Sequence, residues 1–289
     1  MSKSLATVLR MIKFEHSLFA LPFALSGAWL AAEGWPPWRD LVGIVIAAVC
    51  ARSAAMAFNR LVDRGYDATN PRTRNRELVR GLLSPTWTTG FIAVNAALFI
   101  AASFWLAPIC GWLSFPVLAL LLGYSYLKRF SYLCHLGLGL ALACAPAGAW
   151  LAVRKQFDED WPLPVWIGGG VLLWVAGFDL LYALQDRDHD RREGLHSIPS
   201  RFGPLWTRRL ALLFHAGTLL LFARFGSLAD LGPGFYFGLT VVAALLVWEH
   251  WLVRGGRDQA IPVAFFQVNA WVGVAFFLGL AGDLHGVLG

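Results

Sequence analysis

The sequence predicts an all-α polytopic membrane protein, and three observations carry this prediction. The 289 residues are 57% hydrophobic and only 15% charged, whereas an ordinary soluble domain is roughly 25% charged. The apolar residues come in runs of about 17 to 22, the length that a helix needs to cross a hydrocarbon core of roughly 30 Å. Most lysines and arginines lie between these runs, on one side of the expected membrane.

We expect nine spanning helices, one for each apolar run. Some runs contain proline, such as Pro22 and Pro146, which spanning helices tolerate because neighbouring helices satisfy the freed backbone groups. The first run resembles a signal peptide, but eight further runs follow it, so we expect a retained helix. The seventh run is the least apolar, because it contains Arg208 and Arg209. The expected spans are 16–33, 41–60, 88–107, 110–127, 133–153, 163–184, 206–224, 233–253 and 262–281.

The distribution of lysine and arginine predicts a cytoplasmic N-terminus. With that orientation, the inside segments hold 19 of the 24 Lys and Arg residues, counting Arg60 at the membrane boundary. The outside loops hold only Arg39, Arg154, Lys155 and Arg224. This asymmetry follows the positive-inside rule, so topology explains the net charge of +6. Because the basic residues lie in short loops between spans, we expect no nucleic-acid partner.

Two acidic clusters lie where an even-numbered span meets the cytoplasmic side. Asn59, Asp63 and Asp67 are spaced four residues apart, so they share one face if the helix continues past the membrane. Asp186 and Asp190 repeat this spacing later in the chain. The repetition predicts two related helix–loop units that face each other, in two related halves of the chain at about 1–130 and 131–289.

The chemistry of these clusters predicts a metal–diphosphate site. Acidic side chains on one face repel each other unless a cation lies between them. Carboxylate oxygens suit Mg²⁺, which commonly bridges one or two carboxylates to substrate phosphates. The nearby arginines and lysines would neutralise the remaining phosphate oxygens. The alternative is solvated loop charge, as for most single DxxxD pairs, but the repetition on one side of the membrane favours the site.

Polar residues within the expected spans extend both clusters into the membrane. Arg52 lies seven residues before Asn59, on the same helical face and about 10 Å deeper. Asp179 has the same relation to Asp186, with Tyr182 between them on that face. An ionisable group within a span is a functional-site hypothesis. The alternative is that Arg52 pairs with Asp179 to hold two helices together, and the two roles can coexist.

Four motifs resemble those of the UbiA superfamily of intramembrane prenyltransferases. Residues 59–67, NRLVDRGYD, resemble the family motif NDxxDxxxD, and residues 72–78, RTRNREL, resemble its loop RTxxRPL. Residues 179–190, DLLYALQDRDHD, match DxxYAxxDxxxD, and YSYLKR at 124–129 is similar to the fourth-helix element YxxxKR. The resemblance covers essentially the whole chain, so it implies one UbiA-type helical bundle, a single prenyltransferase domain over residues 1–289.

Two positions depart from the family pattern, and the opening of the chain points to one branch. Arg60 stands in place of the second-position Asp of the first motif, and Glu77 in place of the Pro of RPL. Residues 13–31, KFEHSLFALPFALSGAWLA, resemble the branch of 4-hydroxybenzoate polyprenyltransferases. That branch also includes enzymes that prenylate 1,4-dihydroxy-6-naphthoate in an alternative menaquinone route.

The resemblance implies a role for each candidate residue. A polyprenyl group would pass from its diphosphate to an aromatic hydroxy acid, most readily 4-hydroxybenzoate, in ubiquinone-type quinone biosynthesis. Asp179 and Tyr182 would orient the phenol or take the ring proton, and Arg52 with Tyr124 would bind the aromatic acid. The implied Mg²⁺ ligands are Asn59, Asp63, Asp67, Asp186 and Asp190. The implied diphosphate-binding residues are Arg72, Arg76, Lys128 and Arg129.

The expected setting is a bacterial-type inner membrane with the active site facing the cytoplasm. The partners would be the lipid bilayer, a polyprenyl diphosphate and a small aromatic acid, while oligomeric state and prenyl length are not readable from the sequence. A secondary transporter is the alternative of another class, but transporter sites usually lie near the midplane. Here the aspartates lie at or beyond the cytoplasmic ends of the spans. The DGxxAR signature of CDP-alcohol phosphotransferases is absent.

Overall fold

The computed structural model of the chain describes residues 5–13, 17–254, 261 and 264–286. Within them every regular element is a helix, which confirms the predicted all-α class. In chain order the elements are α1 (Leu5–Met11), α2 (Ser17–Ala32), α3 (Trp38–Val62), α4 (Arg64–Thr69), α5 (Pro85–Leu106), α6 (Pro108–Leu127), α7 (Cys134–Arg154), α8 (Pro162–Ala183), η2 (Leu184–Asp186), α9 (Arg187–Arg192), α10 (Ile198–Leu228), α11 (Pro233–Leu252), η5 (Ala264–Val268) and α13 (Asn269–Leu284).

Eight helices in the described part of the chain are long and apolar enough to cross a membrane. They correspond to the second to ninth expected spans. The first expected span, 16–33, corresponds to α2, an apolar helix of only 16 residues. The integral membrane character is therefore confirmed. The count of nine spans is not confirmed, and the cytoplasmic N-terminus stays a prediction.

The seventh expected span, 206–224, is the central part of a longer helix, α10. This helix starts early because Ser197 and Ser200 form a capping box, in which each side chain accepts a hydrogen bond from the other residue's backbone N–H. Gly203, at φ 77° and ψ 177°, then kinks it. Arg208 and Arg209 shorten the apolar run but do not end the helix. The length of an apolar run indicates how much of a helix can lie in the membrane, whereas capping residues determine where the helix begins and ends.

The helix α8 lies at the centre of the bundle. Of its apolar window 67% is buried inside the protein, compared with 17% for α6. Around it, Phe23, Phe222 and Phe276 from α2, α10 and α13 pack with Trp174 of α8, all essentially without exposure. Their rings meet in tilted arrangements that aromatic pairs favour. Most of the surface of α5 and α6 is thus available to lipid, whereas α8 packs against other helices on several sides.

Small residues let the helices approach closely. A Cβ on Gly27 of α2 would lie 2.1 Å from the carbonyl oxygen of Pro146 in α7. Gly238 of α11 and Gly279 of α13 also meet closely, since a Cβ on Gly238 would lie 2.8 Å from the Gly279 Cα. Such contacts are typical of helix packing in membranes, where apolar side chains gain little by leaving lipid.

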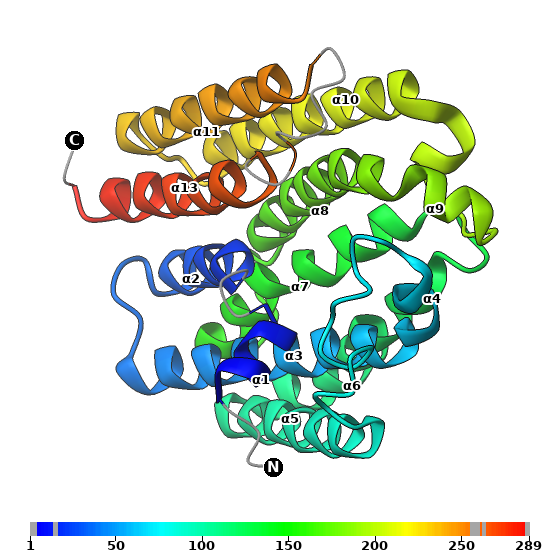
Figure 1. Ribbon diagram of the computed structural model, residues 1–289. Coiled ribbons are helices and arrows are strands. Elements are labelled where there is room, and N and C mark those ends of the chain that lie inside the picture. The colour runs from blue at the N-terminus through cyan, green and yellow to red at the C-terminus, as the bar shows by residue number, and fades with distance from the viewer. Residues whose placement is uncertain (1–4, 14–16, 255–260, 262–263, 287–289) are drawn as a thin grey trace.

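The segments that follow α3 and α8 meet at one end of the bundle. Figure 1 shows α4 and the loop after it beside α9, although they are far apart in the sequence. Asn70, at the end of α4, donates a 2.8 Å hydrogen bond to Asp186, which closes η2. The fold therefore brings the two acidic clusters of the sequence together, as their similarity predicted.

Candidate active site

A cavity of about 540 Å³ occupies this end of the bundle. Its wall is formed by side chains from α3, α4, α6, α7, α8 and the loop between α4 and α5. Of the residues proposed from the sequence, all but Asp190 line it: Arg52, Asn59, Asp63, Asp67, Arg72, Arg76, Tyr124, Lys128, Arg129, Asp179, Tyr182 and Asp186.

The first acidic cluster lies across a break between two helices. α3 ends at Val62, and Asp63, at φ −91° and ψ 4°, separates it from α4. The backbone hydrogen bonds from Asp63 to Asn59 and from Asp67 to Asp63 still join residues four apart. The three side chains therefore keep the shared face that the spacing predicted, and the Asn59 amide donates to an Asp63 oxygen at 2.9 Å.

Basic residues meet both aspartates of this cluster. Arg76 Nη1 lies 2.6 and 2.7 Å from the two carboxylate oxygens of Asp67. Arg129 Nη2 lies 3.4 Å from Asp63 and donates to the Val62 carbonyl at 2.8 Å. Burial, and next the charge of Asp67, raise the pKa of Asp63. Asp63 is thus the acidic residue of this cluster with the weakest compensation, and it gains most from a further cation.

In the second cluster, Asp186 is held by the loop that follows the first. Arg72 donates from Nε and Nη2 to the two oxygens of Asp186, at 2.9 and 2.5 Å, and from Nη1 to the Tyr182 hydroxyl at 2.7 Å. This is the bidentate geometry that guanidinium groups favour with carboxylates. Burial acts against the charged guanidinium, but the Asp186 hydrogen bonds and charge outweigh it and raise the pKa of Arg72.

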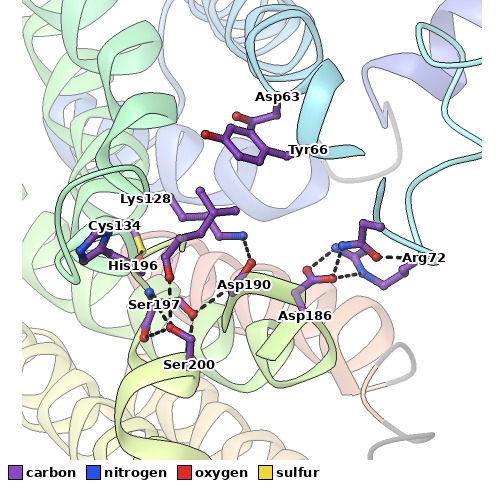
Figure 2. A network of polar contacts seen from close by, with 12 residues as sticks. Asp63, Tyr66, Arg72, Lys128, Cys134, Asp186, Asp190, His196, Ser197 and Ser200 are labelled. Carbon is purple, nitrogen blue, oxygen red and sulfur yellow. Dashed lines mark hydrogen bonds and ion pairs between the residues drawn. The ribbon is translucent and has the colours of Figure 1, made fainter. Parts of the chain in front are cut away.

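The structure turns Asp190 away from the cavity wall. Its side chain is fully buried, with Lys128 Nζ at 2.7 Å from one oxygen and the Ser197 hydroxyl donating to the other at 2.8 Å (Figure 2). The spacing placed Asp190 on one face with Asp186, but the Asp190 carboxylate is held by Lys128 and Ser197 and does not line the cavity.

Lys128 connects the Asp190 network to the cavity, because it lines the cavity wall itself. Burial acts against its ammonium charge, but the charge of Asp190 outweighs this and raises the pKa of Lys128. The Lys128 carbonyl also accepts a 2.7 Å hydrogen bond from the His196 backbone N–H, close to the cap of α10. Asp190 of α9 and His196 of the loop after α9 therefore hold the side chain and the backbone of this lysine (Figure 2).

A second group of polar residues lies deeper in the cavity, within the spans. His135 of α7 and Asp179 of α8 form a pair, with 2.7 Å between His135 Nδ1 and an Asp179 oxygen. Arg52 and Tyr124 line the cavity with them. Sequence reasoning missed His135, although an ionisable residue near the start of an apolar run is a signal for a site. It also missed Asn70, His189 and Ser197, which line the cavity too.

Arg60, which departs from the family motif, lies buried in the cavity wall and donates to the Met11 carbonyl of α1 at 3.3 Å. It therefore fastens α1 to α3 where the motif has a carboxylate. Glu77, the second departure, lies 3.9 Å from Arg10. Both departures join the N-terminal helix to the cavity end of the bundle.

A second, largely apolar cavity of about 220 Å³ adjoins the first. The two share five lining residues: Arg52, Met56, Tyr124, Leu138 and Leu142. Along α7 the second cavity is lined from Leu138 to Ala152, which spans about 21 Å at the rise of an α-helix. The apolar cavity therefore lies where a long apolar chain that begins in the polar cavity could extend between the helices.

Comparisons with known proteins agree with this arrangement. The model of the UbiA prenyltransferase family matches residues 20–277. The chain is 34% identical over 262 residues to a "4-hydroxybenzoate octaprenyltransferase" of Pseudomonas aeruginosa (strain UCBPP-PA14), covering 88% of this chain and 84% of that protein. The apo structure of a UbiA homolog from Aeropyrum pernix K1 matches with a TM-score of 0.85 and 32% identity, covering 93% of this chain and 98% of that one.

A more distant likeness is to a UbiA homolog from Archaeoglobus fulgidus that was solved bound to DMAPP and Mg²⁺. It matches with a TM-score of 0.70 at 17% identity, covering 93% of this chain and 99% of that one, and so shares the fold.

Proposed function

The chain belongs to the UbiA prenyltransferase family, and from this premise we propose that it transfers a polyprenyl group from a polyprenyl diphosphate to an aromatic hydroxy acid. We propose 4-hydroxybenzoate as the acceptor, in quinone biosynthesis. The observation that supports this most is the pair of adjoining cavities, one charged and one apolar, which share five lining residues. An amphiphile with a diphosphate head and a long tail suits such a pair of cavities.

The residues of the charged end fit Mg²⁺ in their chemistry. Asn59, Asp63, Asp67 and Asp186 offer the oxygen ligands that this ion prefers. Within the described residues no three His, Cys, Asp or Glu side chains are grouped as a metal site, because the carboxylates face cations instead. We propose that these residues hold Mg²⁺ once the arginine side chains that now pair with the carboxylates bind the diphosphate instead. Bound there, Mg²⁺ would supply charge stabilisation to the departing diphosphate.

The basic residues of this end would bind the diphosphate itself. Arg72, Arg76, Lys128 and Arg129 already meet carboxylates at 2.5 to 3.4 Å, so they are placed among groups that the diphosphate can replace. Negative charge grows on the diphosphate as the C–O bond breaks, and cations held in place stabilise that charge most. Asp190 is buried behind Lys128, and its proposed role as a further metal ligand requires that this ion pair opens.

The deeper residues would bind the acceptor. Arg52 is the proposed partner of its carboxylate, beside Tyr124 at the junction of the two cavities. Asp179 and Tyr182 would orient the phenol or take the ring proton. Because the second cavity has a mainly apolar lining, the tail would keep water from the allylic cation and prevent its hydrolysis.

The acceptor and the setting are parts of the same proposal. The name of the Pseudomonas relative supports 4-hydroxybenzoate, whereas 1,4-dihydroxy-6-naphthoate presents the same carboxylate and phenol. Eight long apolar helices suit an inner membrane of bacterial type, and by the positive-inside rule the basic loops favour a cytoplasmic active site. Membership of an enzyme family argues against the transporter alternative.

The test is a transfer assay on purified membranes that contain the chain. Each tube receives Mg²⁺ and a polyprenyl diphosphate, with 4-hydroxybenzoate or 1,4-dihydroxy-6-naphthoate as acceptor, and mass spectrometry identifies the product. Prenylated 4-hydroxybenzoate is the expected product. A prenylated naphthoate alone would move the protein to a menaquinone route, and no product from either acceptor, with the protein inserted, would contradict the assigned acceptor class.

A further inference from the structure

The His135–Asp179 pair joins two helices at the deep end of the charged cavity. His135 is the second residue of α7, and Asp179 lies in the last turns of α8. Only 5% of the His135 side chain is exposed, compared with 24% for Asp179. Both residues line the cavity. Asp179 is therefore the member of the pair that a ligand would meet, and His135 is the member that supports it.

The surroundings of His135 determine which residue of the pair donates the hydrogen bond. Its Nε2 is buried and makes no hydrogen bond within the described part of the chain. A hydrogen on a buried nitrogen without an acceptor is costly, so the neutral tautomer carries its hydrogen on Nδ1. That hydrogen is donated to Asp179 Oδ2 at 2.7 Å. The imidazole thus holds one carboxylate oxygen in place, while the carboxylate keeps further acceptor capacity.

The side chains around the pair are of the kinds that can bind an aromatic acid. Arg52 and Tyr124 line the same cavity, and Phe178, the neighbour of Asp179, offers it an aromatic side chain. One turn beyond His135, Leu138 lines both the charged and the apolar cavity. An acceptor at this level would lie beside the prenyl carbon that leaves the diphosphate.

We propose that His135 is a positioning residue, which holds the Asp179 carboxylate toward the hydroxyl group of a phenolic acceptor. This inference rests on the proposed function. The bond between prenyl C1 and the diphosphate oxygen breaks, and its electron pair leaves with the diphosphate. A ring carbon bonds to C1 while Asp179 takes the hydroxyl proton. The ring carbon then loses its hydrogen as a proton and the oxygen regains one, so the prenylated phenol, diphosphate and one proton result.

A purely structural role makes a different prediction. If the pair only clamps α7 to α8, its loss lowers the amount of folded enzyme and slows every step alike. If His135 positions the proton acceptor, its loss leaves ionisation of the diphosphate intact and slows capture of the cation by the acceptor. Water then adds to the cation and loses a proton, which gives the prenyl alcohol. The ratio of prenyl alcohol to prenylated acceptor therefore separates the two roles.

The experiment compares His135→Leu with His135→Asn in the full chain, in membranes, with Mg²⁺, a polyprenyl diphosphate and saturating acceptor. For His135→Leu, formation of the prenylated acceptor should fall about 10- to 100-fold. Its KM for the prenyl diphosphate should stay within about 2-fold, and the share of prenyl alcohol should rise. The Asn amide offers an N–H close to that of Nδ1, so His135→Asn should recover transfer to within about 3-fold of wild type.

Two further variants complete the test. His285→Gln changes a histidine that contacts Trp29 outside the cavity, and it should transfer like wild type. Asp179→Asn keeps the shape of the side chain but cannot take a proton, so it should reproduce the high alcohol share even if His135→Leu does not fold. Equal losses of diphosphate release and transfer in His135→Leu, or wild-type transfer by Asp179→Asn, would overturn the inference. Failure of the proposed function differs, because wild type would then release no diphosphate.

Discussion

Two regions of the described part of the chain bury clusters of polar side chains, and only one of them has the features of a reaction site. The first is the charged cavity between α3, α4 and α8. The second, which we term the polar core cluster, comprises Trp174, His215, Glu249, His250 and Asn269 on α8, α10, α11 and α13. None of the five lines the charged cavity or the apolar cavity beside it. Burial of polar groups alone therefore does not make a site in this fold.

The two regions satisfy their polar groups differently. In the polar core cluster, Asn269 accepts from Trp174 Nε1 at 2.8 Å and donates to Glu249 at 2.7 Å. His215 donates to the Trp174 carbonyl at 3.3 Å, and its other nitrogen meets His250 at 3.0 Å. These bonds connect helices within the bundle, as interhelical hydrogen bonds do in membranes. In the cavity, by contrast, oppositely charged side chains pair in positions that a ligand can reach.

The largest expected effect comes from removing a carboxylate of the cavity. Asp186→Ala takes away a proposed Mg²⁺ ligand and leaves Arg72 without its bidentate partner, so transfer should fall by at least about 1,000-fold. Steady-state assays on matched amounts of inserted protein measure this loss. The control is Asp188→Ala on the same segment, because that side chain is 69% exposed and outside the cavity. Normal activity of Asp186→Ala in excess EDTA would refute the metal assignment.

A smaller loss of activity is expected when lysine replaces an arginine of the cavity, because the positive charge stays but the planar guanidinium group is removed. Arg72→Lys cannot bond both oxygens of Asp186 and the Tyr182 hydroxyl at once, so KM for the prenyl diphosphate should rise about 10- to 100-fold. Arg74→Lys is the matched control, since Arg74 belongs to the same loop but does not line the cavity. Equal kinetics for both variants would show that simple charge suffices there.

The apolar cavity should respond to the length of the donor. Gly148 of α7 lines it, and a Cβ there would meet no atom within 4 Å, so Gly148→Leu can begin a side chain there and take up space in the cavity. We expect kcat/KM for a donor with a long tail to fall about 10-fold, and that for a ten-carbon donor to change little. Gly90→Leu on α5 has the same open surroundings outside the cavity. A loss for both donor lengths would place the tail elsewhere.

The smallest effect on activity should follow from a change in the polar core cluster. Asn269→Leu removes the hydrogen bonds to Trp174 and Glu249 and should destabilise the folded protein by about 1–2 kcal/mol. Thermal unfolding in detergent measures the loss. Specific activity of the folded fraction should stay within about 2-fold of wild type. A fall in kcat comparable to that of Asp186→Ala would remove the distinction between the two regions.

The sequence predicted the apolar spans and the meeting of the two acidic clusters, because both follow from periodicity and spacing. It did not predict the pairing of Arg72 with Asp186, which depends on how the loop after α4 folds across the bundle. Nor did it place Asp190, because the pairing of Asp190 with Lys128 and Ser197 depends on how the loops after α6 and α9 fold. Nor did the sequence predict a role for His135, because that role depends on contact with Asp179 on another helix.

The central claim is that the paired charges of the cavity are exchanged for Mg²⁺ and a diphosphate. The most direct test is calorimetric titration of the detergent-solubilised chain with a prenyl thiolodiphosphate that resists cleavage, in Mg²⁺ and in EDTA. We predict saturable binding in Mg²⁺, strong weakening in EDTA and strong weakening for Asp186→Ala, with Asp188→Ala like wild type. Equal affinity in EDTA and Mg²⁺, or unchanged binding by Asp186→Ala, would contradict the account.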